Sequence, residues 1–187
     1  MQRLLKSSVI AAACLGVGAC ATIKAPHYQS SVDNVQALQG SGGKASVGTV
    51  KVNEAKAAEL NNISLRTNTI ESPYGDYAGY LKEALRADLV AAGRYDQNAP
   101  RAINAVLTRN RLEAGTDKGE AEVAARFTVT EGGKVLYDKE QVAKHDWESS
   151  FMGAVAIPRA VQNYGAAVQK LLVRLFADPD FKKALGG

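Results

Sequence analysis

Two stretches of the chain place apolar side chains at three- and four-residue steps, the spacing of an amphipathic helix. The first covers residues 72–93, where Asp76 is suited to cap the amino end and Gly93 to end the helix in a left-handed conformation. The second covers residues 157–175, with Pro158 suited to its first turn. Its apolar stripe comprises Ile157, Val161, Tyr164, Val168, Leu171, Leu172 and Leu175.

Five other runs have the composition of strands, at residues 45–52, 63–70, 101–112, 120–130 and 135–147. The clearest is 120–130, because its apolar residues alternate with polar ones and predict one buried and one solvated face. The apolar set is Ala121, Val123, Ala125, Phe127 and Val129. Gly132 and Gly133 then supply the positive φ angles of a two-residue hairpin turn, so the last three runs predict an antiparallel meander.

Two shorter helices are also predicted. Residues 31–39 place Val32, Val35 and Leu38 on one side and are closed by Gly40. Residues 178–185 begin with Asp178 as a cap and Pro179 at the first helical position.

The order of the principal elements is strand, strand, helix, strand, strand, strand, helix. Two helices that cover one face of a mainly antiparallel sheet make a two-layer α+β domain. We expect this domain to cover residues 45–187.

The first residues predict a secretory signal, because Arg3 and Lys6 are followed by an uncharged run rich in small residues. The run is too short and too poor in large apolar side chains for a stable membrane span. It ends in Val17, Gly18, Ala19 and Cys20, a sequence that resembles the bacterial lipobox. This resemblance implies cleavage after a signal of residues 1–19 and lipidation of Cys20, which becomes the first mature residue.

Cys14 fits the lipobox less well, because Ala11 stands where the pattern has Leu, Val or Ile. Cleavage before Cys20 removes Cys14, so we expect neither a disulfide nor a cysteine metal site in the mature chain. Residues 20–44 are mainly small and polar and predict a lipidated tether. Residues 40–46 resemble a phosphate-binding loop only partly, since Leu38 and Ala45 replace a required Gly and a required Ser or Thr.

The formal net charge of +4 overstates how basic the mature protein is. Without Arg3 and Lys6, 21 basic residues face 19 acidic ones. A nearly neutral chain with few aromatic residues gives little reason to expect a nucleic-acid partner. No cofactor motif was found, and we expect none.

Candidate catalytic residues are few. His145, Asp146, Ser149 and Ser150 include the residue types of a hydrolase triad, which leaves a periplasmic hydrolase as one alternative. Adjacent strand residues point to opposite faces, however, so we expect a non-enzymatic protein. The other histidine, His27, lies far along the chain, and a metal site is not expected.

Two apolar groups could bind a partner or belong to the core. Tyr74, Tyr77 and Tyr80 could form a sugar-stacking surface, but their position at the start of a helix favours the core. The second group, Trp147, Phe151 and Met152, joins the last strand to the last helix. These three residues either fill the end of the core, which is modestly favoured, or form a candidate surface for a partner or a membrane. An open sheet edge is a further candidate surface.

The lipobox, the polar tether, the helix that ends in LVAAGRYD, the meander and the final helix together resemble the small envelope lipoproteins of Gram-negative bacteria. That group includes the YajG-type lipoproteins, the lipopolysaccharide-assembly lipoprotein and the lipoprotein activators of penicillin-binding proteins. The resemblance covers most of residues 45–177 and implies a binding or assembly role with an envelope protein partner. Resemblance to enterobacterial lipoprotein sorting implies the outer membrane, because Ala21 and not Asp follows Cys20, with the domain facing the periplasm. A lipid- or glycan-binding accessory protein is the main alternative.

Overall fold

The computed structural model describes residues 22–40 and 42–187. Cys20 and the expected signal at 1–19 lie outside the described residues. In chain order, the elements are β1 (Thr22–Lys24), α1 (Val32–Gln39), β2 (Ser46–Val52), a 3₁₀ turn (Glu54–Lys56), α2 (Ala57–Leu60), β3 (Ile63–Leu65), β4 (Asn68–Glu71), α3 (Tyr77–Ala91), β5 (Arg101–Ala114), β6 (Lys118–Glu131), β7 (Lys134–Glu148), α4 (Gly153–Ala177) and α5 (Pro179–Ala184).

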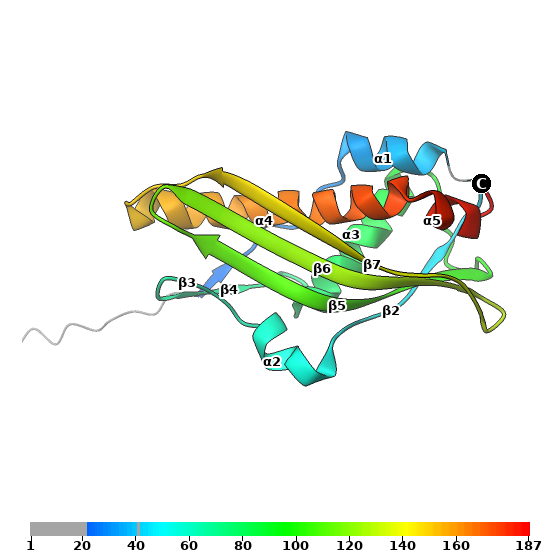
Figure 1. The fold of residues 1–187 in the computed structure, drawn as a ribbon, viewed down its shortest axis with the longest axis horizontal. Helices are drawn as coiled ribbons and strands as arrows, with labels where there is room; N and C mark the ends of the chain where they lie inside the picture. The colour runs from blue at the N-terminus through cyan, green and yellow to red at the C-terminus, as the bar shows by residue number, and fades with distance from the viewer. Residues whose placement is uncertain (1–21, 41) are drawn as a thin grey trace, which may run out of the picture.

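The main sheet has four strands in the order β2-β5-β6-β7 (Figure 1). β5, β6 and β7 form the predicted antiparallel meander, and β2 pairs with β5 in parallel. Gly132 and Gly133 have φ angles of 57° and 83° in the turn between β6 and β7, as predicted. Helices α3 and α4 pack against the sheet, so the α+β class is confirmed.

The apolar residues of β6 form the centre of the core, as their alternation predicted. The predicted face is fully buried, together with the stripe of α4 from Val161 to Leu175. Asp76 caps α3 by accepting a hydrogen bond of 2.6 Å from the amide of Gly79. Gly93 follows α3 with a φ of 68°.

The tyrosines belong to this core. Tyr77 and Tyr80 are 2% and 1% exposed, and both rings lie edge-on to Tyr164 of α4. The Tyr77 hydroxyl donates to the carbonyl of Ile70 at 2.7 Å, and the Tyr164 hydroxyl donates to Asn110 Oδ1 at 2.9 Å. The hydroxyls of Tyr77 and Tyr164 are therefore both hydrogen-bonded inside the core. Tyr74 is partly buried and packs against the same core.

The run at 63–70 is a hairpin of β3 and β4, where a single strand was predicted. Its turn contains Arg66, whose φ of 60° is unusual for a residue that is not glycine. β1 pairs with β4 in parallel and completes a second, three-stranded sheet. Because the turn has neither Gly nor Pro, the sequence carried no usual sign of it.

The last helices begin partly as predicted. α4 starts at Gly153, one turn earlier than expected, because the carbonyl of Met152 accepts from the amides of Val155 and Ala156 at 3.0 Å. Pro158 is therefore inside the helix and not in its first turn. Asp178 caps α5 through a 2.9 Å hydrogen bond from the amide of Asp180, as predicted.

The prediction of a tether is wrong for residues 22–40, because they pack onto the domain. Asn34 and Leu38 of α1 are buried, whereas Val32, predicted on the packed side, is 71% exposed. Asp88 of α3 is fully buried and accepts hydrogen bonds from the Tyr28 hydroxyl at 2.8 Å and from Asn34 Nδ2 at 2.6 Å. These polar contacts, distant in sequence, attach a segment whose composition alone suggested a linker.

The buried Asp88 gives this attachment a pH dependence. Burial raises the pKa of the Asp88 carboxyl, although the hydrogen bonds from Asn34 and Tyr28 partly oppose the rise. The folded state then binds the proton on Asp88 more tightly than the unfolded state does. Protonation of Asp88 therefore stabilises the folded state increasingly as pH falls, and this contribution is lost as pH rises through the folded-state pKa. We therefore expect the unfolding free energy of the parent, relative to that of Asp88→Asn, to be higher at pH 5 than at pH 7. Urea denaturation at the two pH values measures it. Parallel changes in both proteins would contradict this, and Asp33→Asn, on the exposed side of α1, is the control.

Candidate functional site

The most exposed large apolar side chains of the β7–α4 junction are Phe151 and Met152, at 81% and 61% exposure. We call these two residues the apolar tip. The structure separates them from Trp147, which is half-buried against the core and lies over Gly119 of the neighbouring strand. The modestly favoured prediction that all three fill the core is therefore wrong for Phe151 and Met152 and correct for Trp147.

The main chain of the apolar tip is held from two sides. Arg66, in the β3–β4 turn, donates from Nη1 to the carbonyl of Phe151 and from Nη2 to the carbonyl of Ser150, both at 3.0 Å. The amide of Ser149 donates to the carbonyl of Asp117 at 2.8 Å, in the turn between β5 and β6. The amide of Met152 donates to Ser150 Oγ at 3.2 Å. The tip thus has a defined backbone conformation while its side chains face outward.

Arg66 is the residue of this site that the sequence did not reveal. It lies 85 positions before Phe151 and occupies a turn that was predicted to be a strand. An arginine at such a distance gives no local pattern, so only the tertiary structure assigns it.

The candidate hydrolase residues do not converge. His145 Nε2 lies 2.8 Å from Asn163 Oδ1 of α4, whereas Asp146 pairs with Lys118 across the sheet at 3.2 Å. The hydroxyl of Ser149 is buried and has no hydrogen-bond partner among the described residues. In a catalytic triad the nucleophile bonds to the base and the base bonds to the carboxylate. Here His145 and Asp146 bond to other groups, and Ser149 bonds to neither of them.

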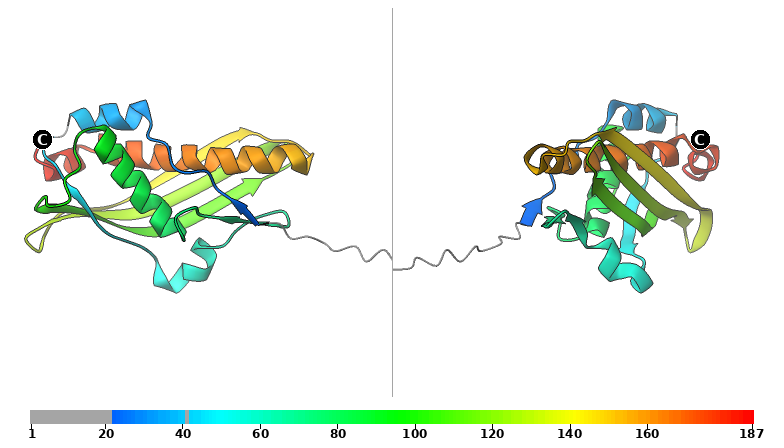
Figure 2. Two further views of the ribbon diagram at one scale, coloured as in Figure 1. Left: turned by 180° about the vertical axis from the view of Figure 1, so that it is seen from behind. Right: turned by 60° about the vertical axis from the view of Figure 1, so that its left-hand side comes forward.

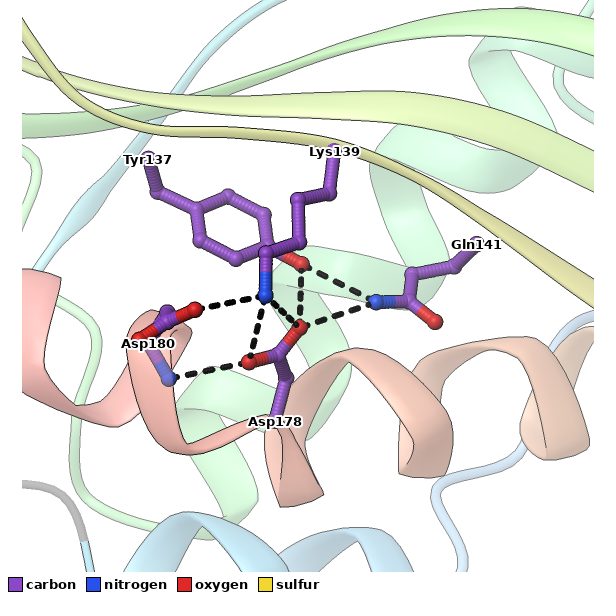
Figure 3. Close-up of polar contacts among 5 residues, drawn as sticks. All are labelled: Tyr137, Lys139, Gln141, Asp178 and Asp180. Carbon is purple, nitrogen blue, oxygen red and sulfur yellow. Dashed lines mark hydrogen bonds and ion pairs between the residues drawn. The ribbon is translucent and has the colours of Figure 1, made fainter.

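The junction of α4 and α5 lies at the opposite end of the molecule (Figure 1) and carries a polar cluster (Figure 3). The carboxylate of Asp178 accepts hydrogen bonds from the Tyr137 hydroxyl at 3.0 Å, from Gln141 Nε2 at 3.2 Å and from Lys139 Nζ at 3.2 Å. Burial would raise the pKa of Asp178, but the hydrogen bonds from the Asp180 amide, Lys139 and Tyr137 outweigh it and lower the pKa. These hydrogen bonds and ion pairs join α5 to β7 at the edge of the sheet.

A cavity of about 460 Å³ adjoins this cluster, with Arg101, Leu136 and Lys183 in its wall. Arg101 pairs with Glu131 at 3.4 Å, and Lys139 pairs with Asp180 at 2.6 Å. The charges of Arg101 and Lys139 are thus compensated within the wall.

The outer edge of β7 is the other candidate surface. Among the described residues, no strand pairs with this edge. Its exposed side chains include Lys134, Lys139 and Lys144, and lysines on an edge strand oppose the addition of another strand. The edge is therefore a weaker candidate than the apolar tip.

Within residues 22–40 and 42–187, no group of three or more His, Cys, Asp and Glu side chains could hold a metal ion. No helix of the same residues combines the length and apolar character that crossing a membrane requires.

The sequence matches no protein-family model and no curated protein. The fold, a helix-covered antiparallel meander extended by a parallel strand, does occur in solved structures. It is similar to a Xanthomonas campestris protein of the family DUF330, with a TM-score of 0.54 at 10% identity over 84% of this chain and 90% of the other. At this identity the similarity concerns the fold alone.

Two further structures are less similar. A predicted lipoprotein from Caulobacter crescentus gives a TM-score of 0.43 at 17% identity, over 58% of this chain and 83% of the other. PelC from Paraburkholderia phytofirmans, solved as a dodecamer, gives 0.36 at 12% identity, over 81% and 93%. The structural neighbours thus include a predicted lipoprotein and PelC.

Proposed function

We propose that this protein is a lipoprotein of the outer membrane, anchored through Cys20, whose periplasmic domain is a non-enzymatic binding or assembly factor for the cell envelope. The lipobox-like sequence at residues 17–20 supports the anchor. The apolar tip carries the binding role: large apolar side chains that are exposed on a fixed backbone favour an interface, because their burial against another surface is favourable and costs little ordering.

The apolar tip can be tested by separating stability from binding. Because both side chains are mostly exposed, we expect the double variant Phe151→Ala with Met152→Ala to change the unfolding free energy by less than about 0.5 kcal/mol. The same variant should recover the bound envelope component, protein or lipid, at least about tenfold less well, because interface energy concentrates in a few large side chains. Recovery is measured by affinity purification from gently solubilised envelopes, followed by mass spectrometry.

Val135→Ala is the matched control, since Val135 is also apolar and 54% exposed but lies at the other end of β7. Recovery at the parental level from a stable double variant would remove the apolar tip from the proposal. Loss of stability by several kcal/mol would instead mean that the tip contributes to the core.

A lipid- or glycan-holding role has one supporting observation. A cavity of about 480 Å³ lies between the segment at 26–29 and α4, with His27, Tyr80 and Gln162 in its wall. The Tyr80 hydroxyl is buried there without a hydrogen-bond partner among the described residues. This alternative is favoured if a lipid or glycan co-purifies with the protein. The double variant Phe151→Ala with Met152→Ala should then retain that ligand, and Tyr80→Phe should lose it.

A further inference from the structure

Thr22, the first described residue, lies at the same end of the domain as the apolar tip. β1 pairs with β4 so that Thr22 is opposite Thr69, and neighbouring strands are about 4.8 Å apart. The turn that contains Arg66 comes directly before β4, and the Arg66 side chain reaches the carbonyl of Phe151. In Figures 1 and 2, the start of β1 and the start of α4 lie at one end of the long axis, and the C-terminus lies at the other.

The proposed anchor is only two residues away from this end. Cys20 precedes Thr22 by two positions, and an extended chain spans at most about 3.6 Å per residue, so their Cα atoms lie within about 7 Å of each other. The acyl chains of a lipidated Cys20 insert into the bilayer and keep the cysteine at its surface. Thr22 is paired with β4, so the end of the domain that carries Thr22 must lie close to the lipid headgroups.

The side chains at this end suit a membrane surface. Phe151 and Met152 are apolar and exposed. Lys24, Arg66 and Arg159 are exposed and take part in none of the ion pairs among the described residues, so their charges can face headgroup phosphates.

Carboxylates limit how basic this surface is. Asp117 and Glu148 are exposed in the same region, where their main-chain carbonyls accept from the amide of Ser149 and from Arg159. Glu71 is also exposed and lies opposite Lys24 in the pairing of β1 with β4. The contact therefore depends mainly on apolar insertion, and only weakly on anionic lipid.

From this arrangement we infer that Phe151 and Met152 insert into the headgroup region of the membrane leaflet that holds the lipidated Cys20. The inference rests on the anchor of the proposed function and names lipid as the partner of the apolar tip. The anchor keeps the tip at a high local concentration beside the bilayer, so even weak insertion is populated. Two contacts, one covalent and one through the tip, then fix the orientation of the domain relative to the membrane.

The experiment uses the full chain, processed in cells and reconstituted into vesicles of phosphatidylethanolamine and phosphatidylglycerol. An environment-sensitive fluorophore is attached at Met152→Cys, with Phe151 retained, and at Val135→Cys as the control at the far end of β7. Because interfacial apolar groups lie about 5–10 Å below the surface, brominated lipids should quench the probe at position 152 by about half and leave the probe at 135 nearly unchanged. Adding Phe151→Asp to the protein labelled at 152 should abolish most of that quenching.

The possible outcomes are distinguishable. If the protein floats with the vesicles but the two probes respond equally to brominated lipid, the anchor stands and the inference is overturned. A probe at 152 that is shielded from aqueous iodide but not quenched by lipid would show contact between two copies of the chain, which also overturns it. If the protein does not float, or if its Cys20 reacts with the fluorophore as a free thiol, the anchor and the inference fail together.

Discussion

Replacing Cys20 with serine is expected to move nearly all of the protein out of the membrane fraction or to leave it unprocessed. Each buried CH₂ of an acyl chain contributes about 0.8 kcal/mol to membrane attachment, and two or three chains on one cysteine make that attachment stable. The apolar tip alone, with two side chains, cannot replace them. The measurement is sucrose-gradient fractionation of envelopes with mass spectrometry of the mature chain.

Cys14→Ser is the control for this prediction, because it lies in the expected signal and should leave both location and mass of the mature chain unchanged. A Cys20→Ser protein that still fractionates entirely with outer membranes and has the parental mature mass would show that the chain is not a lipoprotein of this type.

Replacing Phe127 or Leu171 with alanine is expected to lower the unfolding free energy by about 2 to 5 kcal/mol, through lost burial and the cavity that remains. Both side chains are 0% exposed, and they lie on opposite sides of the interface between β6 and α4. A loss of this size is a large part of the total stability of a single domain. Denaturation in urea or guanidinium chloride measures it directly.

Val135→Ala serves as the surface reference, for which a change within about 0.5 kcal/mol is expected. A loss below about 1 kcal/mol for both core variants would mean that β6 and α4 do not pack face to face. Phe127 and Leu171 belong to the same core cluster, so we expect their effects not to be fully additive in the double variant.

The sequence predicted those parts of the fold in which local pattern and tertiary packing agree. The alternation in β6, the stripe of α4, the caps at Asp76 and Asp178 and the glycines at 132–133 are each a local signal with a physical cause. The parallel pairing of β2 with β5 had no such signal, because register between distant strands depends on the whole sheet.

The site was less predictable, for reasons that particular residues make clear. Trp147, Phe151 and Met152 lie within six residues and are all large and apolar, yet one packs inward and two face outward. That division depends on the space beside Gly119 and on the hydrogen bonds from Arg66, and neither appears as a pattern near residue 147. Likewise, the docking of α1 depends on Asp88, a buried acid on a helix face that composition would assign to solvent.

The attachment of residues 22–40 also has a consequence for the order of assembly. Their partners are spread along the chain: Tyr28 bonds to a residue 60 positions later, and the carbonyl of Gln29 accepts from Gln169 Nε2, 140 positions later. Contacts of such long sequence separation carry a large loop-closure cost and form after local structure. The segment next to the proposed anchor is synthesised first, and its contacts with β4 and α3 need only the first half of the chain. Its contacts with α4 need the last long helix, so we expect the attachment to be complete only when that helix has packed.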